Sequence, residues 1–93
     1  MRVILVYDIA TEEPKDQQRL DKVRKIVRKY LIQVQKSVFE GEITQSKLER
    51  MKHEILSVVD KKRDSVIIYL LEDNATYERH LLTDRQDPTD NIL

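Results

Sequence analysis

Apolar residues recur along the chain at two spacings, one typical of strands and one typical of helices. Residues 2–7 (RVILVY) form a short apolar run rich in Val and Ile, which predicts a strand buried on both faces. From about residue 12 the apolar positions repeat every three or four residues. They predict a helix with an apolar stripe at Leu20, Val23, Ile26, Val27, Tyr30 and Leu31. Pro14 fits the first turn of this helix, where a missing N–H costs no hydrogen bond.

The middle of the chain predicts one or two strands and then a second helix. Residues 32–42 alternate in part and are rich in β-forming residues, and Gly41, the only glycine, is expected to mark a bend or a bulge. The second helix is predicted from about residue 45 to residue 59, with its apolar side at Leu48, Met51, Ile55, Val58 and Val59. Its start has two alternatives: Thr44 as the N-cap, or a capping box of Ser46 with Glu49.

Residues 65–71 (SVIIYLL) predict a last buried strand, which completes the order strand, helix, strand, strand, helix, strand. Right-handed crossovers then place both helices on one face of a four-stranded antiparallel sheet. The predicted fold class is α+β, a ferredoxin-like βαββαβ sandwich over residues 1–83. Residues 75–83 (ATYERHLLT) are expected to add a C-terminal edge strand to the chain's own sheet or to a partner's, and residues 84–93 to form a loosely ordered tail whose last two residues dock.

The last strand also predicts self-association. Its odd-numbered and even-numbered residues, which point to opposite faces of the sheet, are both apolar. Two helices on one face therefore leave apolar side chains on the other face in water. A two-fold homodimer that packs sheet against sheet covers them, because one patch then serves both chains.

Composition excludes several classes of site. The 93 residues are enough for one domain, and the lack of cysteine excludes disulfides, zinc–thiolate sites and a cysteine nucleophile. One glycine cannot supply a GxGxxG or P-loop motif, and the two histidines lack the HExxH spacing of a zinc site. The longest apolar run is far shorter than the roughly 20 residues of a membrane span, and no export signal is visible, so a cytoplasmic protein is expected.

Charge is balanced in total and uneven along the chain. The 17 basic and 17 acidic residues cancel, but residues 19–36 hold seven basic residues against one acidic residue. A dense basic stretch on a helix is typical of a surface that contacts nucleic-acid phosphates, because each neutralised phosphate releases counterions. A solvated helix face is the alternative.

Four segments together resemble a known family. MRVILVYDI, RLDKVRKIVRKY, VQKSVFEGEI and DSVIIYLL, which span roughly residues 1–71 in order and spacing, are similar to the Cas-two family of CRISPR adaptation proteins, which serve antiviral defence. The resemblance implies a ferredoxin-like homodimer in which the aspartate at the end of the first strand, Asp8, faces its mate across the two-fold axis. It also implies a metal-dependent endonuclease on RNA or DNA, and a central bridge held by the integrase partner, Cas-one, during spacer acquisition.

Asp8 is the candidate catalytic and metal-binding residue. Alone in a monomer, an aspartate at a strand end is most often a turn or N-cap residue. Two Asp8 side chains that meet at a dimer axis supply the oxygen ligands that Mg²⁺ prefers, with Mn²⁺ as an alternative. Ser37 would position a metal-bound water or bond to backbone. Tyr7 and Phe39 would stack on bases or pack within the fold.

Arg19, Lys22 and Arg24 match the basic start of the family's first helix and are the candidate phosphate contacts for single-stranded RNA or duplex DNA. The chain departs from the family at residues 12–18, which contain extra acidic residues. This departure leaves open which basic side chain reaches the Asp8 site. Glu12, Glu13 and Asp16 would join the metal or form a solvated loop. Three functions follow: a metal-dependent nuclease, a non-catalytic DNA-binding bridge for the integrase, and a small regulatory or toxin-type dimer.

Overall fold

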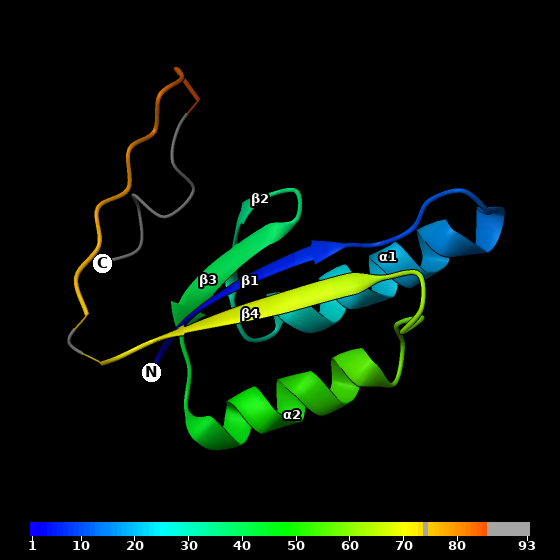
Figure 1. Ribbon diagram of the computed structural model, residues 1–93, viewed down its shortest axis with the longest axis horizontal. Coiled ribbons are helices and arrows are strands. Elements are labelled where there is room, and N and C mark those ends of the chain that lie inside the picture. The colour runs from blue at the N-terminus through cyan, green and yellow to red at the C-terminus, as the bar shows by residue number, and fades with distance from the viewer. Residues whose placement is uncertain (74, 86–93) are drawn as a thin grey trace.

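Strands and helices follow one another in the predicted order and form a sheet with both helices on one side (Figure 1). The structure, a computed structural model, describes residues 1–73 and 75–85. Its elements are β1 (Arg2–Asp8), α1 (Pro14–Arg28), β2 (Ile32–Gln35), β3 (Val38–Glu42), α2 (Gln45–Leu56) and β4 (Ser65–Leu71). The strands lie in the order β2-β3-β1-β4 and every pair is antiparallel, which confirms the ferredoxin-like α+β prediction.

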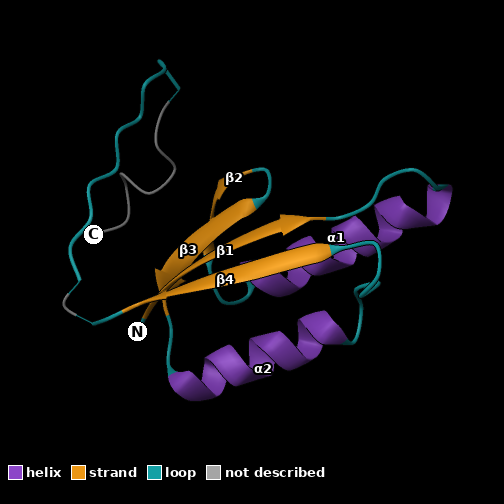
Figure 2. Cartoon of the chain, in the orientation of Figure 1, coloured by secondary structure: helices purple, strands orange, loops and turns teal. Residues whose placement is uncertain are grey.

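The core lies between the sheet and the two helices, which both cover the same sheet face (Figure 2). Strand β1 is central and alternates, so Val3, Leu5 and Tyr7 are buried toward the helices. The apolar stripes of the helices meet them with the buried side chains Val23, Val27, Leu48, Met51 and Ile55. The sequence periodicity therefore placed the right residues in the core.

Helix α2 begins at the first of its two predicted starts. Thr44 is the N-cap, and its hydroxyl oxygen accepts a hydrogen bond from the backbone N–H of Lys47 at 3.3 Å. Ser46 lies inside the helix, so it is not an N-cap. The helix ends at Leu56, earlier than predicted, although Val58 and Val59 still pack against the core.

Gly41 marks neither a bend nor a bulge, contrary to the prediction. It lies within β3 opposite Val3 in regular register, and the one register shift between β2 and β3 falls at Gln33/Gln35. A Cβ atom on Gly41 would lie 3.3 Å from Cδ2 of Leu31. Close packing of the α1–β2 connection on β3 therefore accounts for the glycine.

Strand β1, predicted to be buried on both faces, is covered by the helices on one face only, and β4 leaves apolar side chains on its other face as predicted. Along β4, Val66 and Ile68 pack on the core, whereas Ile67 and Tyr69 are 47% and 53% exposed. Ile4 and Val6 of β1 pair with Tyr69 and Ile67 and lie on the same uncovered side. We call this side of the sheet the open face.

Residues 75–85 form no strand, so addition of an edge strand to the chain's own sheet does not occur in this part of the chain. The segment runs away from the sheet (Figure 1), and it is tied back where the Tyr77 hydroxyl accepts a hydrogen bond from Nε of Arg2 at 2.7 Å and where Arg79 pairs with Glu40. Addition to a partner's sheet stays a prediction. The predicted tail, residues 84–93, lies outside the described residues from position 86 onward, as does the docking of its last two residues.

Candidate metal and nucleic-acid site

Asp8 is the last residue of β1, and its side chain is exposed. It pairs in register with Ser65 of β4. Side chains alternate along a strand, so Asp8 shares its side with Ile4 and Val6 and lies on the open face. The carboxylate thus borders the apolar surface that the helices leave uncovered.

One chain supplies Asp8 as a lone candidate ligand. Within residues 1–73 and 75–85, no group of three or more His, Cys, Asp or Glu side chains is close enough to hold a metal ion. Carboxylate oxygen suits Mg²⁺, which in proteins typically takes one or two carboxylates together with waters and substrate phosphates. The Asp8 carboxylate is therefore of the ligand type that such an ion takes.

Tyr7 and Phe39 pack in the core on the helix side of the sheet. Their ring centroids are 5.7 Å apart, and both side chains are almost completely buried. The Tyr7 hydroxyl donates a hydrogen bond to the carbonyl oxygen of Lys36 at 3.0 Å. In this arrangement the two rings stabilise β1 and β3 from the face opposite Asp8, which favours the packing alternative over stacking on bases.

Ser37 lies in the turn between β2 and β3. Its carbonyl oxygen accepts a hydrogen bond from the backbone N–H of Tyr7 at 3.1 Å. The turn is thereby held next to the end of β1. A role of the Ser37 hydroxyl toward a metal-bound water stays a prediction.

The three candidate basic residues differ in exposure. Arg19 is only 14% exposed, and its guanidinium donates to Asp64 at 2.6 Å and to Asp16 at 2.8 Å. These two hydrogen bonds raise the pKa of Arg19 above its usual range. Arg24 is partly exposed and lies 3.8 Å from Asp21, whereas Lys22 is exposed on α1. Lys22 is thus the most accessible of the three, and Arg19 the least.

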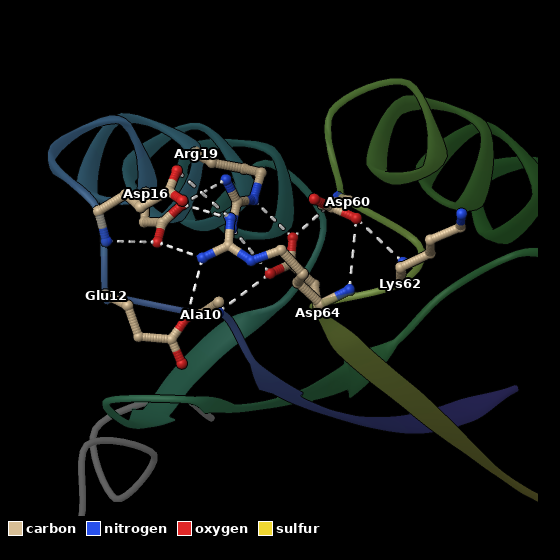
Figure 3. A network of polar contacts seen from close by, with 9 residues as sticks. Ala10, Glu12, Asp16, Arg19, Asp60, Lys62 and Asp64 are labelled. Carbon is tan, nitrogen blue, oxygen red and sulfur yellow. Dashed lines mark hydrogen bonds and ion pairs between the residues drawn. The ribbon is translucent and has the colours of Figure 1, made fainter.

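Two acidic residues near the start of α1 pair with Arg63, which is in the segment before β4. Figure 3 shows these two acids, Glu12 and Asp16. Arg63 lies 2.7 Å from Asp16 and 2.9 Å from Glu12. Asp16 is fully buried, and its hydrogen bonds from Arg63 and from the backbone N–H of Glu13 hold its pKa well below the usual range. Asp16 is therefore a structural ion-pair partner, a role that neither sequence alternative described.

Arg63 and Asp64 were not among the predicted site residues, because residues 60–64 only separate the second predicted helix from the last predicted strand. The available signal was a basic residue in this loop and an excess of acidic residues at positions 12–16, around the start of α1. Pairing between segments about 50 residues apart depends on the crossover geometry, which periodicity does not describe.

Comparison with known proteins identifies the family. The family model described as CRISPR associated protein Cas2 matches residues 1–79. The chain belongs to the Cas2 family. Among curated Cas2 relatives, the "CRISPR-associated endoribonuclease Cas2 2" of Moorella thermoacetica is 52% identical over 98% of this chain and 100% of its own length. The "CRISPR-associated endoribonuclease Cas2" of Methanocaldococcus jannaschii is 41% identical over all of this chain and 76% of its own length.

Solved Cas2 structures share the fold. The Streptococcus pyogenes Cas2 crystal structure at pH 6.5 is similar with a TM-score of 0.72 and 39% identity, over 80% of this chain and 89% of that one. A second structure, described as cas2, has a TM-score of 0.74 and 32% identity, over 94% of this chain and 88% of that one. Within the described residues, no helix is long and apolar enough to cross a membrane. Membership of the Cas2 family replaces the regulatory or toxin-type dimer as the explanation of the fold.

Proposed function

We propose that the chain is a metal-dependent endonuclease of CRISPR adaptation that acts in the cytoplasm as a homodimer, with one Asp8 from each copy. The observation that carries the proposal is the place of Asp8 on the open face, beside the apolar residues Ile4, Val6, Ile67 and Tyr69. The curated relatives are named endoribonucleases, and these names support a substrate with phosphodiester bonds. Single-stranded RNA is the first candidate and duplex DNA the second.

Symmetry connects the apolar surface with the carboxylate. An isologous dimer uses the same patch on both chains, so a second copy seated on Ile67 and Tyr69 has its own Asp8 at the border of the same interface. The two Asp8 carboxylates, one from each chain, then form together the metal-binding group that a single chain lacks among its described residues. The dimer is thus a condition of the proposed site.

The chemistry assigned to the chain is limited to binding and orientation. The two Asp8 carboxylates would hold Mg²⁺, or Mn²⁺ in its place, and Ser37 would orient a water. When bound, the metal polarises a phosphoryl oxygen and lowers the pKa of an attacking water. The strand end keeps each carboxylate exposed, so a substrate phosphate can reach it.

The test is cleavage by the Asp8→Asn protein, with labelled RNA and duplex DNA in Mg²⁺, Mn²⁺ or chelator. Cleavage should fall to the level seen with chelator, because an amide is a much weaker metal ligand than a carboxylate, while folding and dimerisation are retained. Asp21→Asn is the matched control, since it makes the same change at an exposed position on α1 and should leave the rate unchanged. Cleavage that persists in Asp8→Asn would reject Asp8 as the catalytic residue.

A second function, a non-catalytic bridge for the integrase Cas-one, is favoured by a different observation. Lys22 and Lys25 are exposed on α1, which covers the sheet face opposite Asp8. Phosphates held on that helix surface would be bound without the help of Asp8. Nucleic-acid binding and metal binding are therefore separable in this fold.

The bridge is tested by spacer integration with the integrase present. Replacement of both Lys22 and Lys25 by Glu, which reverses their charge, should abolish integration. Asp8→Asn should leave integration intact. On duplex DNA, each lost phosphate contact should reduce the slope of log affinity against log salt by about 0.9. Integration that survives the double reversal would reject α1 as the contact surface.

A further inference from the structure

Four charged side chains join the segment after β1 to the segment before β4. We call Asp16, Arg19, Arg63 and Asp64 the inter-loop cluster. Figure 3 labels Asp16, Arg19 and Asp64. Asp16 and Asp64 have no exposed side-chain surface, and Arg19 lies between them with a hydrogen bond to each. Both acids are lowered in pKa by these partners, Asp16 chiefly by Arg63 and Asp64 chiefly by Arg19. The cluster is thus fully ionised at neutral pH.

Asp64 accepts four N–H donors with its two oxygens. Oδ1 accepts from the backbone N–H of Ala10 at 3.0 Å and from Nη2 of Arg19 at 3.0 Å. Oδ2 accepts from Nε of Arg19 at 2.6 Å and from the backbone N–H of Asp60 at 2.8 Å. The carboxylate therefore fixes two stretches of backbone and one guanidinium at once.

Two residues joined by this carboxylate, Ala10 and Asp64 itself, lie close to Asp8. Ala10 follows Asp8 by two residues, and Ser65, the chain neighbour of Asp64, is the residue opposite Asp8 in the β1–β4 pairing. One buried carboxylate thus holds the exit of the strand that carries Asp8 to the start of the strand beside it. The tie therefore lies at the strand ends next to Asp8.

We propose that Asp64, held in place by Arg19, is the positioning residue for Asp8. The inference rests on the proposed function, because it assigns to Asp64 the aim of the Asp8 carboxylate toward a metal shared with a second copy. Shared ligands must be held to within about 0.5 Å, which requires a supporting shell of this kind. Arg19 then acts on the site through Asp64 and makes no contact with nucleic acid.

The chemistry of Asp64 supplies a substitution without a change of volume. Each of its oxygens receives two N–H donors, so in Asp64→Asn the amide NH₂ must face two donors whichever way it is turned. At least one tie to Ala10 or Asp60 is lost. Glu54→Gln is the matched control. The Glu54 carboxylate accepts hydrogen bonds from Lys29 and Tyr30 at 2.7 Å each, and it joins α2 to the C-terminal end of α1, away from the inter-loop cluster.

The first experiment measures Mn²⁺ binding by calorimetry, which requires no turnover. Wild type and Glu54→Gln should bind Mn²⁺ equally, and Asp8→Asn should abolish binding. Asp64→Asn should weaken binding about 10–100-fold, as the loss of supporting hydrogen bonds does at other metal sites. Wild-type affinity in Asp64→Asn would overturn the inference and leave the proposed function standing.

The second experiment separates positioning from phosphate contact. Arg19→Gln should weaken Mn²⁺ binding to a similar extent and leave the salt dependence of duplex binding unchanged, whereas Lys22→Gln should lower that slope by about 0.9 and leave Mn²⁺ binding unchanged. A slope lowered equally by both variants would overturn the assignment of Arg19.

A third measurement covers the case in which wild type shows no Mn²⁺ binding that depends on Asp8. The proposed function then fails, and the positioning role is judged by NMR. In Asp64→Asn, hydrogen exchange at the Ala10 amide or the Asp60 amide should accelerate, because one of these two bonds is lost, and the Asp8 side-chain carbon signal should shift, with none of these effects in Glu54→Gln. Unchanged Ala10 and Asp60 amides together with an unchanged Asp8 signal would overturn the inference.

Discussion

The Asp16 carboxylate has no exposed surface, and the reason is its position between two arginines. Arg63 approaches at 2.7 Å and Arg19 at 2.8 Å, so the cost of burying the charge is offset by hydrogen bonds to both oxygens. The residue also accepts the backbone N–H of Glu13 at 2.8 Å, just before α1 begins. A residue that sequence suggested for a solvated loop or a metal is therefore part of the interior.

Stability should fall in acid because of this carboxylate. The folded-state pKa of Asp16 lies below its ordinary value of 3.8, so its contribution is fully present above about pH 4 and is lost as pH falls through the folded pKa. Asp16→Asn should be less stable at pH 7 and lose less stability between pH 5 and pH 3. Urea unfolding midpoints at both pH values measure this loss. The control Asp21→Asn should lose as much stability between pH 5 and pH 3 as the wild type.

The start of helix α2, for which the sequence allowed either Thr44 or Ser46 as the N-cap, is set by the backbone. Thr44 has extended dihedral angles (φ −78°, ψ 160°), as an N-cap requires, whereas Ser46 already lies within the helix. The chain leaving β3 reaches the helix at Thr44, since the backbone N–H of Ile43 still donates to the carbonyl of Met1. The sheet therefore fixed the point at which the helix could start.

Removal of this cap gives a prediction for the element. Thr44→Ala should lower the free energy of unfolding by about 1 kcal/mol, because the N–H of Lys47 loses its acceptor. Ser46→Ala, the control for the other alternative, should change it by less than about 0.5 kcal/mol. Chemical denaturation of both variants gives the comparison, and a larger loss in Ser46→Ala would mean that the helix starts later in solution.

For the whole molecule, the open face is the feature that most strongly predicts association. Ile67 and Tyr69 lie beside Ile4 and Val6, so exposed apolar side chains from two neighbouring strands form one surface. A second copy is the proposed cover, because the same surface carries Asp8.

A charge at the centre of this surface should separate the copies. Ile67→Glu places an unpaired carboxylate in the interface twice, and it should weaken dimerisation by more than about 100-fold. The chain should stay folded, since Ile67 points away from the core. Leu56→Glu is the control, as Leu56 is 56% exposed on α2 and away from the open face. Light scattering distinguishes the two, and an unchanged dimer in Ile67→Glu would place the interface elsewhere.

Much of the fold was predictable because its elements are encoded by local periodicity. The strand at residues 65–71 was predicted with its observed bounds, and the helical stripe at Val23 and Val27 faces the core as expected. The candidate site was predicted less well. Arg19 and Lys22 look alike in sequence, yet one is enclosed by two carboxylates and the other is exposed.

The sequence by itself determined the order of elements, the core-facing stripes of the helices and the position of Asp8 at a strand end, because periods of 2 and 3.6 residues and strand length act over a few residues. Only the tertiary structure decided that Asp8 lies on the open face, that Phe39 is core, and that Asp64 and Arg19 hold the ends of two strands together. These depend on which segments the right-handed crossovers bring side by side, and residues 45 positions apart carry no local sign of that contact.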